Sequence, residues 1–167
     1  MWPAIAILAF VTLQRLAELK FARENTARLL KAGGHEAGRE HYPLIVLVHA
    51  AWLATLWALA PGRPISWPLI GVFAVLQLAR LWVIRSLGPL WTTRIIVLPG
   101  APLVKRGPYR FMKHPNYAVV MAEIAVLPLA FGLPLVAGIF FGANIVALSI
   151  RVRAEERALT EADRPGP

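Results

Sequence analysis

The segment 107–117 holds the densest group of residues that can do chemistry, and it reads Gly-Pro-Tyr-Arg-Phe-Met-Lys-His-Pro-Asn-Tyr. The Gly-Pro pair predicts a turn. His114 stands beside Pro115 at the start of an expected helix, whose free N–H groups and positive dipole end can hold an anion. Tyr109 and Tyr117 add rings with hydroxyl groups. Such a corner can bind a ligand with a carboxylate, a cation and an aromatic base, and the alternative is an ordinary Pro-initiated helix with basic flanks.

Glu123 is an ionisable residue inside an apolar stretch, where a charge is costly and by default suggests a function. It shares a helical face with Asn116, so an amide and a carboxylate point the same way near one end of that helix. We favour a site role for Glu123. The alternative is that it pairs with Arg80, also within an apolar stretch, and fixes helix packing. Arg15 and Glu18 are three residues apart and are expected to pair with each other or to extend to the membrane interface.

A second candidate group follows the last apolar stretch. Asn144, Leu148, Arg151 and Glu155 are spaced four, three and four residues apart, which places them on one helical face. Glu155 and Glu156 are thereby presented just beyond that stretch. The alternative is a solvated, salt-bridged helix end.

Thiol and metal chemistry find little support in the sequence. The chain has no cysteine, which excludes disulfides, thiolate nucleophiles and iron-sulfur clusters. Its four histidines are scattered, with no His-x-x-His pair and no companion carboxylate at ligand spacing. We therefore expect no metal site.

The elements that position these residues are expected to be membrane helices. Of 167 residues, 57% are hydrophobic and 16% charged, a composition that fits a membrane protein better than a soluble domain. Five apolar stretches approach or reach the roughly 20 residues that cross a bilayer. We expect one all-α polytopic domain over 1–167, with spans at 2–19, 43–60, 65–87, 115–131 and 133–150 and a tail helix at 151–162. The last two spans should form a tight hairpin, and the short apolar run 95–98 should lie at the interface or dip back into the membrane.

The basic residues are divided unevenly between the two sides of this layout. Of the 18 Lys and Arg residues, fifteen fall after the first span, after the third span or in the tail, and only Arg63 falls on the opposite side. Basic loops face the cytoplasm, so we expect the N-terminus outside and the C-terminus and the site at the cytoplasmic face. Topology then accounts for the net charge of +9, and no nucleic-acid partner is expected.

Two segments together resemble the isoprenylcysteine carboxyl methyltransferase (ICMT) family. Segment 107–117 is similar to that family's Gly-x-Tyr-x-x-x-Arg-His-Pro-x-Tyr signature before the penultimate helix. Glu155, Glu156 and Leu159 match the Glu-Glu-x-x-Leu signature after the last helix. Most of the remaining chain is similar to a bacterial branch proposed to methylate alkylpyrones, which implies a multi-pass protein of the bacterial inner membrane.

The resemblance implies an S-adenosylmethionine-dependent methyltransferase that releases S-adenosylhomocysteine. Its cofactor site would lie among helix ends, so the absence of a Gly-x-Gly-x-x-Gly fingerprint is no objection. The matched residues that would surround the cofactor are Tyr109, His114, Pro115, Asn116, Tyr117, Glu155 and Glu156.

The acceptor implied is a lipophilic small molecule, such as a prenylcysteine or an alkylpyrone-type polyketide lipid, that enters from the lipid bilayer between helices. A cation such as Arg94 or Arg151 would hold a carboxylate or enol oxygen in line for the transfer. For a neutral phenol or amine, Glu123 or Glu155 would act as the base. Two other functions stay open: phospholipid N-methylation, and a small membrane subunit without enzymatic activity.

Overall fold

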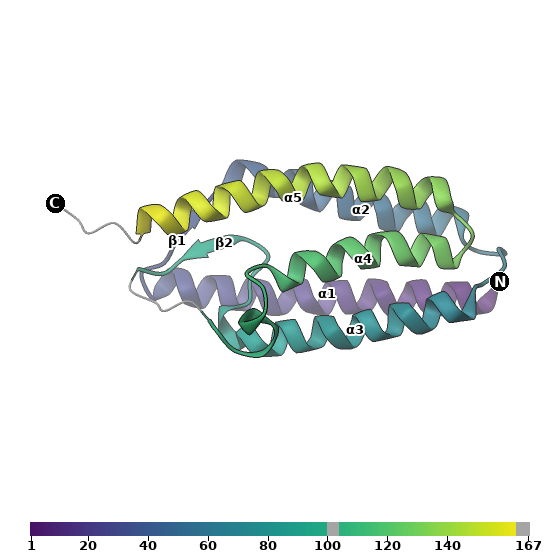
Figure 1. Ribbon diagram of the computed structural model, residues 1–167, viewed down its shortest axis with the longest axis horizontal. Coiled ribbons are helices and arrows are strands. Elements are labelled where there is room, and N and C mark those ends of the chain that lie inside the picture. Colours follow the sequence, from purple (N-terminus) through teal and green to yellow (C-terminus); the bar gives the residue numbers. More distant parts are fainter. Residues whose placement is uncertain (100–103, 163–167) are drawn as a thin grey trace.

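Five long helices form a single bundle in the part of the chain that the structure describes, residues 1–99 and 104–162 with the backbone alone at 159, 161 and 162 (Figure 1). In this computed structural model the helices are α1 (Trp2–Lys31), α2 (Tyr42–Leu59), α3 (Trp67–Leu87), α4 (Pro115–Ala130) and α5 (Pro134–Ala162). A proline occupies the first or second position of each of the first four helices, and α5 begins at Pro134. Proline presets the helical φ and lacks an N–H that would have no partner there, so each start is encoded locally.

The chain is an all-α membrane protein, as the sequence predicts. Three of the described helical segments are long and apolar enough to cross a membrane, namely Arg39–Leu59, Trp67–Leu90 and Pro134–Ala158. The fourth helix is apolar but shorter, with 16 residues. α1 runs to Lys31, well past the end predicted for the first span. α5 continues without a break from its apolar part into the predicted tail helix.

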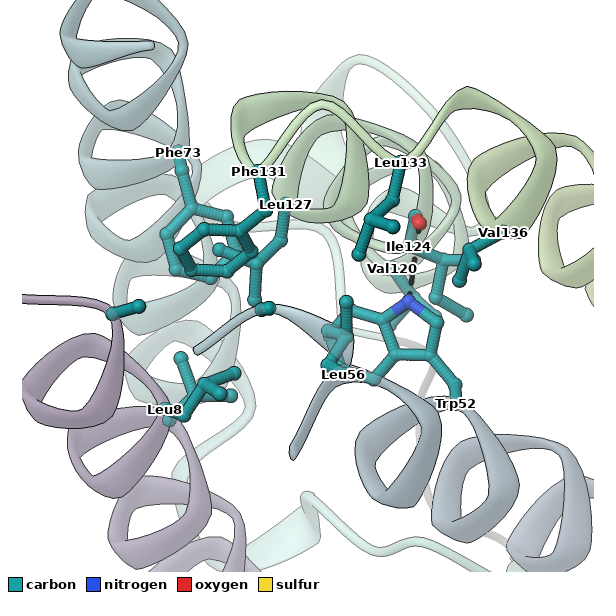
Figure 2. Packing of buried hydrophobic residues seen from close by; sticks show 13 residues of the cluster. Leu8, Trp52, Leu56, Phe73, Val120, Ile124, Leu127, Phe131, Leu133 and Val136 are labelled. Carbon is teal, nitrogen blue, oxygen red and sulfur yellow. Dashed lines mark hydrogen bonds between the residues drawn. The ribbon is translucent and has the colours of Figure 1, made fainter. Parts of the chain in front are cut away.

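The apolar core lies at the end of the bundle where α4 turns into α5. Side chains from all five helices meet there, among them Leu8, Leu56 and Phe131 (Figure 2). Trp52 of α2 donates its indole N–H to the carbonyl oxygen of Ile124 in α4, at 3.2 Å (Figure 2). That oxygen has no helical partner because the residue four positions on is Pro128, which lacks an N–H. The opposite end, where α3 ends and α4 begins, is called the basic end below.

A two-stranded antiparallel ribbon stands at the basic end. It pairs β1 (His35–Ala37) with β2 (Ile95–Val97), and Glu36 lies opposite Ile96. The ribbon packs on the last part of α5 through the apolar residues Ile95, Val97, Ala154 and Ala158. Residues 95–97 of the predicted interfacial run 95–98 form β2 and pair with the segment that follows α1. The position of this run relative to the membrane stays a prediction. The described elements are connected in part by three short 3-10 helices, namely η1 (Arg39–His41), η2 (Gly88–Leu90) and η3 (Gly107–Arg110).

Candidate functional site: a polar corner at the basic end

Four side chains form a polar corner where the start of α4 meets α5. These are His114, Tyr117, Arg151 and Glu155, and they are called the corner below. The Tyr117 hydroxyl donates to Glu155 Oε2 at 2.5 Å and accepts from Arg151 Nε at 2.8 Å. The Arg151 guanidinium also lies 5.8 Å from the centre of the Tyr117 ring. The structure thus brings together the two segments, 107–117 and the tail helix, that the sequence singled out separately.

His114 completes the corner and leaves polar atoms without partners. Its ring stacks on Tyr117, with centroids 5.2 Å apart, and its Nδ1 lies 3.9 Å from Glu155 Oε2. Among the described residues, His114 Nε2 and Asn116 Oδ1 are buried and have no hydrogen-bond partner. The first turn of α4 begins at the buried Pro115 and has no side-chain cap. Buried polar groups are normally paired, so these two atoms make the corner a candidate ligand site.

η3 presents Tyr109 to the same corner. Burial raises the pKa of the Tyr109 phenol above its usual value, and the nearby negative charge of Glu155 raises this pKa further. The phenol therefore stays protonated at neutral pH and can donate a hydrogen bond. Gly107, which opens η3, has φ +57°, and a Cβ atom there would lie 2.0 Å from Ser86 Oγ of α3. Only glycine fits this position without displacing α3.

Glu123 lies two turns further along α4, in a different cluster. It is six positions after Tyr117, about 9 Å along the helix axis. Its Oε2 accepts from Arg15 Nη2 at 2.7 Å and from Arg80 Nη1 at 3.1 Å, and its Oε1 accepts from Gln77 Nε2 at 2.9 Å. The pairing of Glu123 with Arg80, which was the alternative to the favoured site role, is present in the structure. These bonds occupy three of the roughly four acceptor positions of the carboxylate. The role of Glu123 as a base stays a prediction.

The cluster continues from Glu123 to α1. Glu18 accepts from Arg80 Nε and Nη2, both at 2.7 Å, and from Arg15 Nη1 at 3.1 Å. The expected pair of Arg15 with Glu18 is therefore present. The four residues Arg15, Glu18, Arg80 and Glu123 are called the ion clamp below, and they join α1, α3 and α4 with balanced charge.

The structure does not bring every predicted residue to the corner. Arg94 instead bonds both oxygens of Glu36 at 3.0 and 2.9 Å, and its guanidinium lies 4.8 Å above the Tyr42 ring. Glu156 is exposed, on the face of α5 next to that of Glu155. Catalysis by Arg94 and cofactor binding by Glu156 stay predictions. The predicted residues that do contact the corner tyrosine, Tyr117, are Arg151 and Glu155.

An open apolar groove of about 390 Å³ lies along α5, beside Met121 of α4 and next to the corner. Its lining residues are Met121, Ile145, Leu148, Ser149, Val152 and Arg153. Met121 is one helical turn from Tyr117, so the groove begins beside the corner and continues along the apolar part of the bundle. Asn144 lies behind it, fully buried, with Nδ2 3.1 Å from Met121 Sδ and with no partner for its Oδ1 among the described residues.

Sequence reasoning missed two features that support the site. The first is the link from α1 to Glu123 through Arg15, although two arginines and two glutamates inside apolar stretches were a usable signal of a balanced cluster. The second is Asn25 of α1, whose Nδ2 donates to the carbonyl oxygens of Gly88 at 3.1 Å and Trp91 at 2.7 Å. Nothing in the sequence marks a side chain whose partners are loop carbonyl groups more than sixty residues away.

An all-helical membrane bundle with a polar corner at its helix ends is the class of protein that these observations define. Comparison with known proteins narrows the class, because residues 69–161 match the isoprenylcysteine carboxyl methyltransferase (ICMT) family. The chain belongs to that family. It is 45% identical over 166 residues to "Uncharacterized protein YpbQ" of Bacillus subtilis (strain 168), a match that covers 96% of each chain.

A second relative is "Uncharacterized protein" of Haemophilus influenzae, 23% identical over 154 residues and covering 87% of this chain and 88% of the relative. No solved structure matches the chain. Membership of the family indicates a membrane methyltransferase, and the printed names of these relatives give no acceptor.

Proposed function

We propose that the protein transfers a methyl group from S-adenosylmethionine to an oxygen atom of a lipophilic acceptor. The observation that carries the proposal is the corner itself. The residues that match the family signatures converge there from two separate segments, and two of their buried polar atoms, on His114 and Asn116, have no partner among the described residues. Such atoms are costly to leave unpaired unless a ligand meets them.

The residues at the corner fit the chemistry of this cofactor. Its amino acid part needs an acceptor for an ammonium group and donors for a carboxylate, and its adenine needs a ring to lie against. Glu155 supplies an acceptor, the uncapped first turn of α4 supplies backbone donors, and Tyr109, His114 and Tyr117 supply rings. Bound there, S-adenosylmethionine would supply an activated methyl group by in-line displacement and leave as S-adenosylhomocysteine, so no covalent nucleophile is needed.

The groove along α5 is our candidate site for the apolar part of the acceptor, such as a prenyl or alkyl chain. Its volume of about 390 Å³ lies within the range of small-molecule sites. An acceptor lying in it would place its polar head toward Arg151. Among the described residues only Nε of Arg151 is bonded, which leaves its Nη atoms to hold a carboxylate or enolate oxygen. For a phenol, Glu155 is the carboxylate at the corner that can take the proton.

We also infer that the basic end faces the cytoplasm of a bacterial inner membrane, with the N-terminus outside. The uneven distribution of lysine and arginine supports this orientation. A cytoplasmic corner would meet S-adenosylmethionine directly, while the groove meets lipid.

Cofactor binding is tested by titrating S-adenosylhomocysteine into the detergent-purified protein by calorimetry. We expect His114→Ala to weaken binding about tenfold or more, since about 1.4 kcal/mol corresponds to a factor of ten. His41→Ala is the matched control, because His41 also lies at the basic end, in η1, but has a side chain that is 39% exposed and pairs with Glu40. If the unaltered protein fails to bind at millimolar ligand, the proposal is wrong. Equal binding by the parent and a folded His114→Ala protein would remove the corner from the cofactor site.

The acceptor is tested by incubating membranes that contain the protein with a donor labelled on its methyl group, followed by chromatography of the lipids. The proposal expects label in an O-methylated apolar product that is absent with the His114→Ala variant. Label in methylated phosphatidylethanolamine would overturn O-methylation and favour phospholipid N-methylation instead.

A further inference from the structure

The start of α4 is recessed relative to the end of α3. The two helices are antiparallel neighbours, and a hydrogen bond from the Ser66 amide to the Ala130 carbonyl, at 2.8 Å, puts the beginning of α3 level with the end of α4. α3 has 21 residues and α4 has 16. At a rise of about 1.5 Å per residue, the difference of five residues means that α4 begins about 7.5 Å before α3 ends.

η3 lies at this recessed level, against the side of α3. Arg106 Nε donates to the carbonyl oxygen of Ser86 at 2.7 Å. A Cβ atom on Gly107 would lie 3.2 Å from Trp82 Nε1, one turn earlier in α3. A helix of 21 residues spans about 30 Å, which equals the hydrocarbon thickness of a bilayer. η3 and the residues after it therefore lie at the depth of the membrane interface and not out in water.

The residues between η3 and α4 have the composition of an interfacial segment. Phe111 is 76% exposed and Met112 is 50% exposed, although both are large and apolar. Arg110 and Lys113 flank them and are exposed as well. Trp82, 51% exposed at the same depth, is an aromatic residue of the kind found in interfacial belts. Apolar side chains between cations are suited to the boundary where acyl chains meet lipid phosphates.

We propose that the tip formed by residues 110–113 is a membrane anchor for an anionic lipid surface. Phe111 and Met112 enter the leaflet at the basic end, while Arg110 and Lys113 contact lipid phosphate groups. The partner is anionic lipid because, among the described residues, the end of the bundle that carries the tip also carries fourteen basic residues, and a polybasic surface is attracted to an anionic leaflet. His114 follows the tip directly, so the anchor fixes the corner at the membrane surface.

The absence of cysteine from the chain permits a clean measurement of depth. A single nitroxide label is attached to the Phe111→Cys variant, which is placed in nanodiscs of phosphatidylcholine with phosphatidylglycerol. Power saturation then compares how often the label collides with oxygen, which is enriched in lipid, and with a water-soluble nickel chelate. Ile139→Cys, exposed in the apolar part of α5, is the reference for lipid, and Arg157→Cys, exposed on the tail, is the reference for water.

We expect the label at 111 to collide with oxygen at least about threefold more, relative to nickel, than the label at 157. Adding Arg110→Gln and Lys113→Gln should move it toward the water reference, and so should nanodiscs of phosphatidylcholine alone. A label at 111 with the nickel accessibility of position 157 would overturn the anchor. If the label lies in lipid but its depth changes neither with the two glutamine substitutions nor with the charge of the lipid, the proposal that the partner is anionic lipid is wrong. Neither measurement depends on methyl transfer.

Discussion

Replacing Glu123 with glutamine should destabilise the bundle by about 2 to 5 kcal/mol. Glu123 is 1% exposed, and its carboxylate accepts three hydrogen bonds, two of them from arginines of α1 and α3. Hydrogen bonds in membrane bundles average about 0.6 kcal/mol, so three of them give a lower limit near 2 kcal/mol. Breaking a buried ion pair costs about 3 to 5 kcal/mol in proteins, because the remaining charge stays buried without compensation.

The free energy of unfolding is measured by titrating sodium dodecyl sulfate into mixed micelles that contain the protein and following tryptophan fluorescence. Glu156→Gln is the control, since it removes an exposed carboxylate and should change the free energy of unfolding by no more than about 0.5 kcal/mol. Arg80→Gln combined with Glu123→Gln should cost less than the sum of the single changes, with a coupling of about 0.5 to 3 kcal/mol.

A loss below about 1 kcal/mol for Glu123→Gln would refute the argument that the ion clamp holds α1, α3 and α4 together. The same variant separates the two roles considered for Glu123. If it unfolds more easily but the folded fraction still transfers methyl groups, Glu123 is a packing residue. If it is as stable as the parent and binds the cofactor but is inactive, Glu123 is the base.

Three further substitutions test the corner and its supports. Tyr117→Phe removes the hydroxyl that joins α4 to α5 and should weaken S-adenosylhomocysteine binding about tenfold in calorimetry. Unchanged affinity would show that this hydroxyl does not organise the corner. Gly107→Ala should lower the free energy of unfolding by about 1 to 3 kcal/mol, because the added Cβ clashes with Ser86. Gly71 is a helical glycine with open space around it, so the control Gly71→Ala should leave the free energy of unfolding unchanged or raise it, and equal results for the two variants would contradict the steric argument. Asn25→Leu removes two hydrogen bonds to loop carbonyl groups, so amide hydrogen exchange in residues 88–94 should accelerate by about tenfold or more. Unaltered exchange would show that α1 does not hold this loop.

The elements and the corner were largely predictable from local signals. Apolar length and helix-starting prolines gave α2 to α5 within a few residues, and four-three-four spacing placed Asn144, Leu148 and Arg151 on a buried face of α5. The ribbon was not predictable in this way. Its two strands are three residues each, and the pairing of His35 with Val97 depends on where the long α1 delivers the chain. Periodicity cannot report such a contact, because neither strand is long enough to show one.

The position of the core explains how the corner can leave polar atoms unpaired. Each buried polar group without a partner costs about 1 to 3 kcal/mol, and His114 Nε2 and Asn116 Oδ1 both lie at the basic end. The largest apolar cluster lies at the other end of the bundle and is formed by all five described helices, so most of the apolar stabilisation comes from outside the corner and can offset this cost. The ion clamp stands between the two and sets the register of α4 without occupying the corner. The unpaired polar groups of the corner can therefore form hydrogen bonds with a ligand. Substitutions in the corner should alter ligand binding more than they alter the free energy of unfolding.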